Sequence, residues 1–157
     1  MGVRQGGLTG PVDVPLRNPA ELARRLELAA PERLLLVDAP DSLLALAQSV
    51  REGRSAPEAV EGDAIRSVKE TFDGILLWRE ERPGSQAILH AAARRLAPGG
   101  VLWVVVALRK VTGVRTPAIH RLDREDVVKA FEKEGLVPDR EVRVSAWHAA
   151  HRFARPA

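Results

Sequence analysis

The stretch Val101-Leu-Trp-Val-Val-Val-Ala-Leu108 contains eight consecutive apolar residues and decides the fold. Such a run is typical of a β-strand that is covered on both faces, as at the centre of a parallel sheet. It follows Leu96-Ala-Pro-Gly-Gly100, where two glycines let the chain turn sharply into a central strand. Two shorter apolar runs, Arg33–Asp38 and Phe72–Trp78, have the same character. We therefore expect a sheet built on these three buried parallel strands.

Segments in which apolar residues recur at helical spacing alternate with these strands. They begin at capping residues and end near glycine or proline, as helices do. The predicted helices span 18–30, with Asn18 as the cap; 41–53, with Asp41 or Ser42 as the cap; 85–96; and 123–135, with Asp123 as the cap and Gly135 as the left-handed end. A brief strand at 57–60 and a short helix from Asp63 through Lys69 complete the expected elements.

The C-terminal part of the chain predicts a β-hairpin. Glu141–Ser145 alternates with period two, Trp147 and His148 are expected to form a tight turn, and His151–Arg155 is expected to return as the antiparallel partner. Together these patterns predict an α/β fold: a Rossmann-like, doubly wound, mostly parallel sheet with helices on both faces and a C-terminal antiparallel hairpin.

Length and composition limit the classes of protein to which this chain can belong. A chain of 157 residues suits one domain, so we expect residues 16–157 to form it and the glycine- and proline-rich residues 1–15 to be a flexible arm. The absence of cysteine excludes disulfides, thiolate catalysis and cysteine-bound metals. No window is apolar enough to span a bilayer and the start lacks the apolar core of a secretory signal, which predicts a cytoplasmic protein without a membrane partner.

The charge is unevenly distributed along the chain. The net charge of +3 divides into −3 over residues 1–78 and +6 over residues 79–157. The basic second half favours an anionic partner. Ordinary surface variation is the preferred explanation for a difference of this size, because nucleic-acid binding requires the basic residues to cluster on one face.

Three pieces of the sequence, in this order, resemble a class I S-adenosylmethionine-dependent methyltransferase. They are the Phe72–Trp78 strand, the Leu96–Gly100 join with the strand behind it, and the closing helix with its hairpin. The resemblance covers residues 33–155. A closer likeness is to a group of small bacterial methyltransferase-like domains of unknown function, in which a basic Gly-Val-x-Thr loop precedes the last helix. The matching residues here are the loop Arg109–Thr116, then Gly135-Leu-Val137, Trp147 and Phe153.

Departures from the family's pattern argue against catalysis. The turn after the first strand, Asp38-Ala-Pro-Asp41, lacks the glycines that let a cofactor approach the backbone. Only residues 39–71 separate the first two central strands, where the family has about two strand–helix units that include an acidic ribose ligand. Where an amino-methylating enzyme would carry Asn- or Asp-Pro-Pro and an aromatic residue, the chain has Trp78-Arg-Glu-Glu81. We therefore expect no cofactor.

The candidate ligand sites lie where strands end, because ligands of open α/β sheets bind outside the carboxyl ends of the strands. If S-adenosylmethionine binds, the resemblance places it at Asp38, Ala39, Pro40, Asp41 and Trp78, although a large aromatic residue at a strand end more commonly seals the sheet. Glu80 and Glu81 lack the spacing of metal ligands, so we expect no metal site, and no Ser–His–Asp pattern supports hydrolase chemistry.

Two basic regions are candidates for binding anions or nucleic acid. Arg109, Lys110, Arg115 and Thr116 flank a glycine loop suited to a phosphate. In the hairpin, Arg143, Trp147 and Arg152 are residues of the kind that stack on bases and pair with the backbone of RNA or single-stranded DNA. In both regions a solvated loop without a ligand is the simpler interpretation.

Three hypotheses follow. The first is a non-catalytic methyltransferase-like module that works through protein contacts, as a homo-oligomer or with a protein partner. The second is a divergent S-adenosylmethionine-dependent methyltransferase. The third is a protein that binds RNA or single-stranded DNA through the basic loop and hairpin, with an affinity that falls steeply as salt rises.

Overall fold

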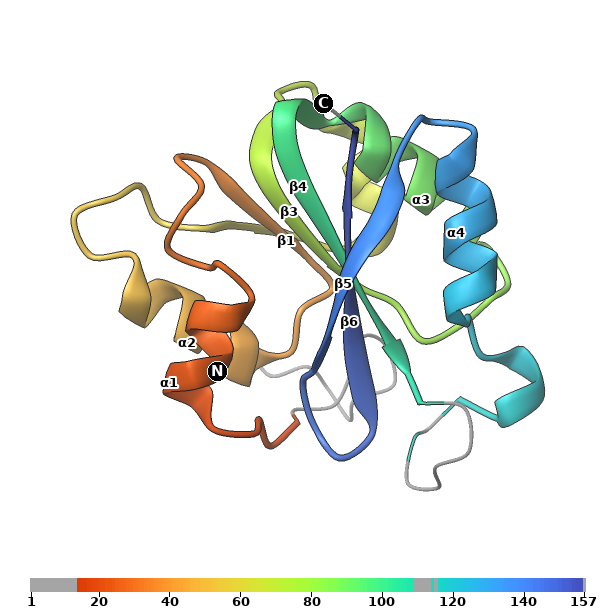
Figure 1. Cartoon of the computed structure of the whole chain (residues 1–157), viewed down its shortest axis with the longest axis horizontal. Coiled ribbons are helices and arrows are strands. Elements are labelled where there is room, and N and C mark those ends of the chain that lie inside the picture. Colours follow the sequence, from red (N-terminus) through yellow and green to blue (C-terminus); the bar gives the residue numbers. More distant parts are fainter. Residues whose placement is uncertain (1–13, 109–113, 115, 157) are drawn as a thin grey trace.

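The computed structural model describes residues 14–108, 114 and 116–156, which form one six-stranded sheet with helices on both faces (Figure 1). The strand order is β2-β1-β3-β4-β6-β5. The strands are β1 (Leu34–Val37), β2 (Glu58–Val60), β3 (Phe72–Trp78), β4 (Leu96–Ala107), β5 (Val137–Arg143) and β6 (His148–Ala154); the helices are α1 (Pro19–Arg25), α2 (Asp41–Val50), α3 (Ser85–Arg94) and α4 (Arg124–Glu132), with 3-10 turns η2 (Gly62–Ser67) and η3 (Ala118–His120).

The sheet combines a parallel half with an antiparallel end. Strands β2, β1, β3 and β4 run parallel, with Leu36 beside Leu76 and Leu76 beside Trp103. Strand β6 is inserted antiparallel between β4 and β5. The predicted fold class, mostly parallel and doubly wound with a C-terminal antiparallel hairpin, is confirmed.

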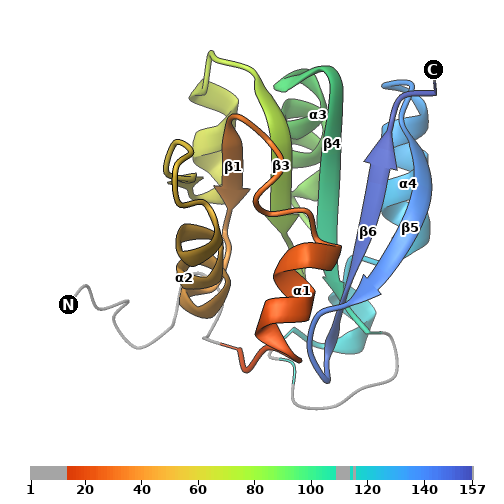
Figure 2. The same cartoon turned by 60° about the vertical axis from the view of Figure 1, so that its left-hand side comes forward.

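Each face of the sheet has its own apolar core. Leu35, Ile75 and Val104 project toward α3 and α4, whose Leu89 and Phe131 complete that core. The alternate strand residues face α1 and α2, and Figure 2 shows these two helices together on one side of the sheet. The apolar strands are continuous in sequence because both of their faces are covered. No helix among the described residues is both long and apolar enough to cross a membrane.

Several predicted helix ends are corrected. Helix α1 ends at Arg25 rather than near Ala30, because Glu27 adopts a left-handed conformation with φ of 58°. Asn18 makes no side-chain capping bond and is itself left-handed. Helix α2 begins at Asp41 with Pro40 in the cap position, while the Ser42 hydroxyl donates to the Val14 carbonyl at 2.7 Å.

The last helix begins and ends as expected. The Asp123 carboxylate accepts from the Asp126 amide, and the Asp126 side chain accepts from the Asp123 amide, which makes a complete capping box. Gly135 has φ of 77°, the left-handed conformation that favours glycine.

The hairpin differs from its prediction in register. Strand β6 begins at His148, so this residue is paired with Ala107 of β4 rather than placed in a turn. The connection is formed instead by residues 144–147. His148 and His151 therefore lie on the same strand, three positions apart, and project to opposite faces of the sheet.

Residues 39–71 hold one compressed strand–helix unit. The expected brief strand is β2, and the expected short helix is the 3-10 turn η2. The residue that precedes η2 is Glu61 rather than Asp63, and no side chain caps the turn. The chain thus passes from β1 through α2 to β2 and returns to β3 beside β1. The parallel half of the sheet ends at β2.

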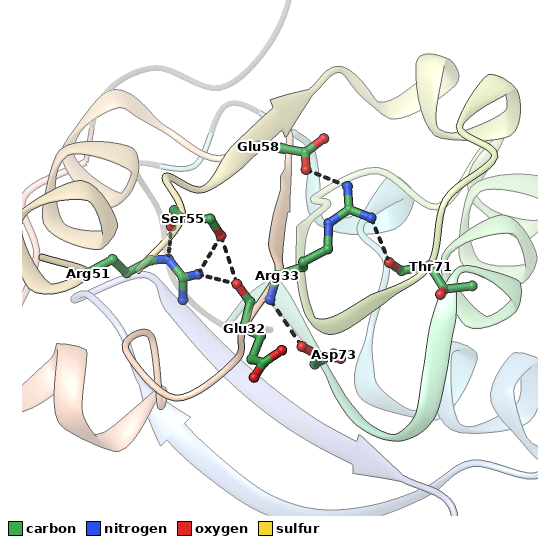
Figure 3. Close-up of polar contacts among 7 residues, drawn as sticks. All are labelled: Glu32, Arg33, Arg51, Ser55, Glu58, Thr71 and Asp73. Atoms are coloured by element: carbon green, nitrogen blue, oxygen red, sulfur yellow. Dashed lines mark hydrogen bonds and ion pairs between the residues drawn. The ribbon is translucent and has the colours of Figure 1, made fainter. Parts of the chain in front are cut away.

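The amino ends of these strands are clamped by two arginines (Figure 3). Arg51 is only 2% exposed, and its guanidinium donates to the carbonyls of Pro31 at 2.8 Å and Glu32 at 3.0 Å. Arg33 pairs with Glu58 at 2.7 Å. Because these side chains bond to one another and to backbone, this end of the sheet is a structural clamp, and the ligand-binding possibilities lie at the opposite edge.

Candidate ligand site at the carboxyl edge of the sheet

The carboxyl ends of the four parallel strands lie at one edge of the molecule. In open α/β sheets ligands bind in the crevice outside these ends. The residues that leave the strands there are Asp38 after β1, Glu61 after β2, Arg79 and Glu80 after β3, and Leu108 after β4.

Asp38 ties β1 to the segment after β2. Its carboxylate accepts a hydrogen bond from the Gly62 amide at 2.9 Å. A Cβ atom added to Gly62 would lie 2.6 Å from Oδ2 of Asp38, so the backbone must approach this closely without a side chain. Burial raises the pKa of Asp38 above its usual value, although the Gly62 amide and the charge of Arg79 oppose that effect. Asp38 itself has φ of 57°, a conformation that non-glycine residues seldom adopt.

The turn that would face a cofactor is short and closed by side chains. Ala39 and Pro40 alone separate Asp38 from the first residue of α2, and Pro40 is buried. Trp78, the last residue of β3, is buried in the core that faces α1 and α2. The structure brings Asp38, Ala39, Pro40, Asp41 and Trp78 to one edge of the sheet, with Trp78 beneath the surface.

The sequence analysis missed an acidic residue at this edge. Glu61 directly follows β2, is exposed, and lies next to the glycine that Asp38 holds. It comes twenty-three positions after Asp38, close to the spacing of about 20 residues at which dinucleotide-binding folds place the carboxylate that bonds a ribose hydroxyl. The sequence signal for this residue was an acidic side chain directly after the short expected strand that ends at Val60.

These residues fit part of an adenosyl site. Glu61 offers an exposed carboxylate at the end of the second parallel strand, as a ribose requires. The Asp38–Pro40 turn does not offer the bare backbone that the methionine part of S-adenosylmethionine would approach.

A buried hydrogen-bonded chain lies beside Trp78 and was not predicted. Glu80 Oε2 is 2.6 Å from Nε2 of His148, and Nδ1 of the same imidazole is 2.9 Å from the Ser145 hydroxyl. The Ser145 hydroxyl also accepts from the Trp147 amide at 3.0 Å. The rings of Trp78 and His148 are in contact, with centroids 4.6 Å apart. The partners are 68 residues apart in sequence, so no local spacing could have revealed them.

The backbone holds Glu80 in a fixed position. The Leu122 amide donates to the Glu80 carbonyl at 2.8 Å, and the Arg82 amide donates to the His120 carbonyl at 2.7 Å. Burial alone would raise the pKa of Glu80, but the hydrogen bond and charge of His148 lower it below its usual value, with help from Trp78 and Thr116. Glu80 is therefore an ionised carboxylate whose side chain is 19% exposed.

The chain from Ser145 to Glu80 resembles a nucleophilic triad only in its residue types. Ser145 is 0% exposed, so no substrate carbonyl can reach its hydroxyl. The arrangement orients Glu80 and gives no support to hydrolase chemistry. No group of three or more potential metal ligands occurs among the residues that the structure describes.

The structure describes only one of the four residues of the predicted basic loop site. Arg109, Lys110 and Arg115 lie outside the described residues. Thr116 is buried, and its hydroxyl is 3.4 Å from Oε1 of Glu80. This residue therefore faces the carboxylate at the end of β3.

The hairpin residues do not share one face. Arg143 pairs with Ala149, and Arg152 projects to the other side of the sheet. Arg152 is 18% exposed and bonds Glu27 at 2.9 Å and Asp139 at 2.6 Å. Trp147 is half-buried against the α1–α2 core. A continuous basic and aromatic surface on the hairpin is absent among these described residues.

The fold is that of the class I S-adenosylmethionine-dependent methyltransferases. The O-methyltransferase NcsB1 of neocarzinostatin biosynthesis, solved with S-adenosyl-L-homocysteine and 1,4-dihydroxy-2-naphthoic acid, is 14% identical and has a TM-score of 0.64 over 88% of this chain. The N-methyltransferase NodS of Bradyrhizobium japonicum, with S-adenosyl-L-homocysteine, is 19% identical with a TM-score of 0.59; the alignment covers 88% of this chain and 87% of NodS. An Aquifex aeolicus S-adenosylmethionine-dependent methyltransferase is 13% identical with a TM-score of 0.59, covering 87% and 88% of the two chains.

The likeness is one of architecture. The chain spans 57% of the length of NcsB1. No protein-family model and no curated protein sequence matches the chain. Identities below 25% establish the fold, while function is carried by the site.

Proposed function

We propose that this protein is a divergent S-adenosylmethionine-dependent methyltransferase that binds the cofactor at the carboxyl edge of the sheet. The observation that carries the proposal is Glu61, an exposed carboxylate at the end of β2 beside the Asp38–Gly62 contact. Structures with this fold hold S-adenosyl-L-homocysteine.

Each residue at this edge has a distinct role in the proposal. Glu61 accepts hydrogen bonds from the ribose hydroxyls, and Asp38 fixes the segment on which Glu61 lies. Trp78 closes the floor of the site. When bound, S-adenosylmethionine supplies a methyl group activated by a sulfonium ion.

Titration calorimetry with S-adenosylmethionine and with S-adenosylhomocysteine tests the proposal. We expect binding to the wild type, and Glu61→Ala to weaken it by about tenfold or more, since a charge-assisted hydrogen bond is lost. Glu52→Ala is the matched control, because Glu52 is also exposed but follows α2, away from the end of β2. Absence of heat at millimolar cofactor would overturn the proposal.

A second candidate is a non-catalytic module that acts through protein contacts. The observation that favours it is the Asp38-Ala-Pro turn, in which side chains rather than bare backbone face the cofactor position. This candidate expects no response to either cofactor, together with a homo-oligomer or a co-purifying partner in native mass spectrometry. A monomer that binds S-adenosylmethionine would exclude it.

A further inference from the structure

An open groove with a volume of about 540 Å³ lies between the segment that leads into α1 and the outer side of α2. Pockets that bind small molecules commonly have volumes of about 300–1,000 Å³, so this groove is large enough for one. It is lined by Val14, Pro15, Leu16 and Pro19 from the segment and by Ser42, Ala45, Leu46 and Ser49 from α2. None of these residues is charged, although charged residues make up 29% of the chain. The groove therefore differs in chemistry from the chain as a whole.

The side of α2 that lines the groove is not the side that packs on the sheet. The lining residues of α2 are three or four positions apart, which places them along one side of the helix. Leu43 and Ala47 are buried in the core toward the sheet. The outward side of a surface helix usually carries charged and polar residues, yet Asp41 is the only charged residue in α2. Packing within the fold does not account for this uncharged outward side.

Hydrogen bonds and a proline hold the wall of the groove in place. The Ser42 hydroxyl donates to the Val14 carbonyl at 2.7 Å, which ties the segment to α2. The Arg17 amide donates to the Val144 carbonyl at 3.1 Å, which ties the same segment to the connection between β5 and β6. Pro15 lies between these two bonds and restricts the backbone there, because its ring fixes φ. A ligand would therefore enter a preformed site and would lose little free energy in ordering it.

We infer that this groove binds a small, neutral, mainly apolar molecule that carries one N–H or O–H donor. A charged ligand would lose hydration without gaining a counter-ion, because no charged residue lines the groove. The exposed Ser49 hydroxyl donates to the Leu46 carbonyl at 2.8 Å, and a hydroxyl oxygen can accept as well as donate. Ser49 is thus the residue to which the donor of the ligand would bond.

This site goes beyond the proposed function. The proposed cofactor position follows the ends of β1 and β2, whereas the groove runs along the outer side of α2. Occupancy of the groove does not require S-adenosylmethionine, so the two sites are tested separately.

A fluorescent probe tests the inference on the full chain without any cofactor. N-Phenyl-1-naphthylamine is neutral, carries a single N–H donor and fluoresces more strongly in apolar surroundings. We expect its fluorescence to rise and to saturate at one equivalent of protein. The related 8-anilinonaphthalene-1-sulfonate carries a negative charge and should bind at least about tenfold more weakly, because the groove offers it no counter-ion.

A pair of substitutions at adjacent positions of α2 locates the probe. Ser49→Asp places a charge in the groove and should weaken the binding of N-phenyl-1-naphthylamine about tenfold. Gln48→Asp is the matched control and should leave the affinity unchanged, because Gln48 is an exposed neighbour that does not line the groove.

Ala45→Trp provides a second arm that adds bulk rather than charge. Ala45 is exposed, so circular dichroism should show an unchanged fold, while the indole occupies the groove and removes probe binding. Loss of binding in the two groove variants together with full binding in Gln48→Asp supports the inference. A probe that does not saturate, or equal affinities in Ser49→Asp and Gln48→Asp, would overturn it.

Discussion

The Asp38 carboxylate and the Gly62 amide, 2.9 Å apart, join the end of β1 to the first turn after β2. This bond fixes Gly62, the residue that directly follows Glu61. Glycine is needed at position 62 because a side chain there would meet the Asp38 carboxylate.

Gly62→Ala should destabilise the protein by about 1–3 kcal/mol, the usual cost of forcing an extra methyl group into a filled space. The new Cβ would meet Asp38 Oδ2 at 2.6 Å. Urea unfolding measures the change, with Ser67→Ala in the same 3-10 turn as an exposed control. An unchanged free energy of unfolding would show that Asp38 moves aside freely.

Asp38 should make stability fall as the pH rises. Burial raises its pKa in the folded protein above the value of 3.8 that applies when unfolded, so the folded state holds the proton more tightly. That contribution is complete below pH 3.8 and is lost as the pH rises through the folded pKa. Asp38→Asn keeps an acceptor for Gly62, so its free energy of unfolding should improve relative to wild type as the pH increases. A pH-independent difference between the two proteins would contradict this assignment.

Glu80 should have the opposite effect. Its folded pKa lies below 4.5, so its contribution to stability is present above pH 4.5 and disappears as the pH falls through the folded pKa. Acid unfolding followed by circular dichroism should therefore be less steep in Glu80→Gln than in the wild type. Acid unfolding of Glu81→Gln should match that of the wild type, and an equal change in both variants would exclude the His148 pair as the cause.

Arg51→Ala should cost about 2–4 kcal/mol, because several buried or partly buried carbonyls lose their donor at once. These include the carbonyls of Leu28, Pro31 and Glu32. Arg54→Ala, three positions away and exposed, should change stability little. Thermal or urea unfolding of the two variants makes the comparison.

The hairpin should contribute weakly to nucleic-acid binding. Arg143 and Arg152 lie on opposite faces, and Arg152 is occupied by Glu27 and Asp139. If a single-stranded RNA oligomer binds, Arg143→Ala should lower the dependence of log affinity on log salt by about one, and Arg152→Ala should not. Fluorescence anisotropy at several salt concentrations gives both slopes. Equal losses in the two variants would show that Arg152 leaves its carboxylates to bind phosphate.

The centre of the sheet was predictable because β1, β3 and the second half of β4 are nearly pure apolar runs. Strands β3 and β4 are covered on both faces, so nearly all of their residues are apolar. The capping box at Asp123 was predictable for a similar reason, since both partners lie within four residues. In these elements the residues that stabilise the structure are close neighbours in the sequence.

The failures arose where distant contacts override local preference. His148 lies in β6 because it pairs with Ala107 and bonds Glu80, and neither partner is near in sequence. Asn18 is a good capping residue by type, yet its left-handed backbone carries the chain into α1 without a side-chain bond. Glu61 was overlooked because β2 is three residues long and mostly exposed, which gives almost no hydrophobic pattern.

The insertion of β6 between β4 and β5 has a consequence for biosynthesis. The Glu80 carboxylate is held by His148, a residue that leaves the ribosome 68 positions later. A nascent chain that ends before β6 leaves the edge of β4 unpaired. An unpaired apolar edge strand can pair with other chains and aggregate. We therefore expect the edge of β4 to be covered and the Glu80 carboxylate to be oriented in the same late step, when β6 pairs with β4.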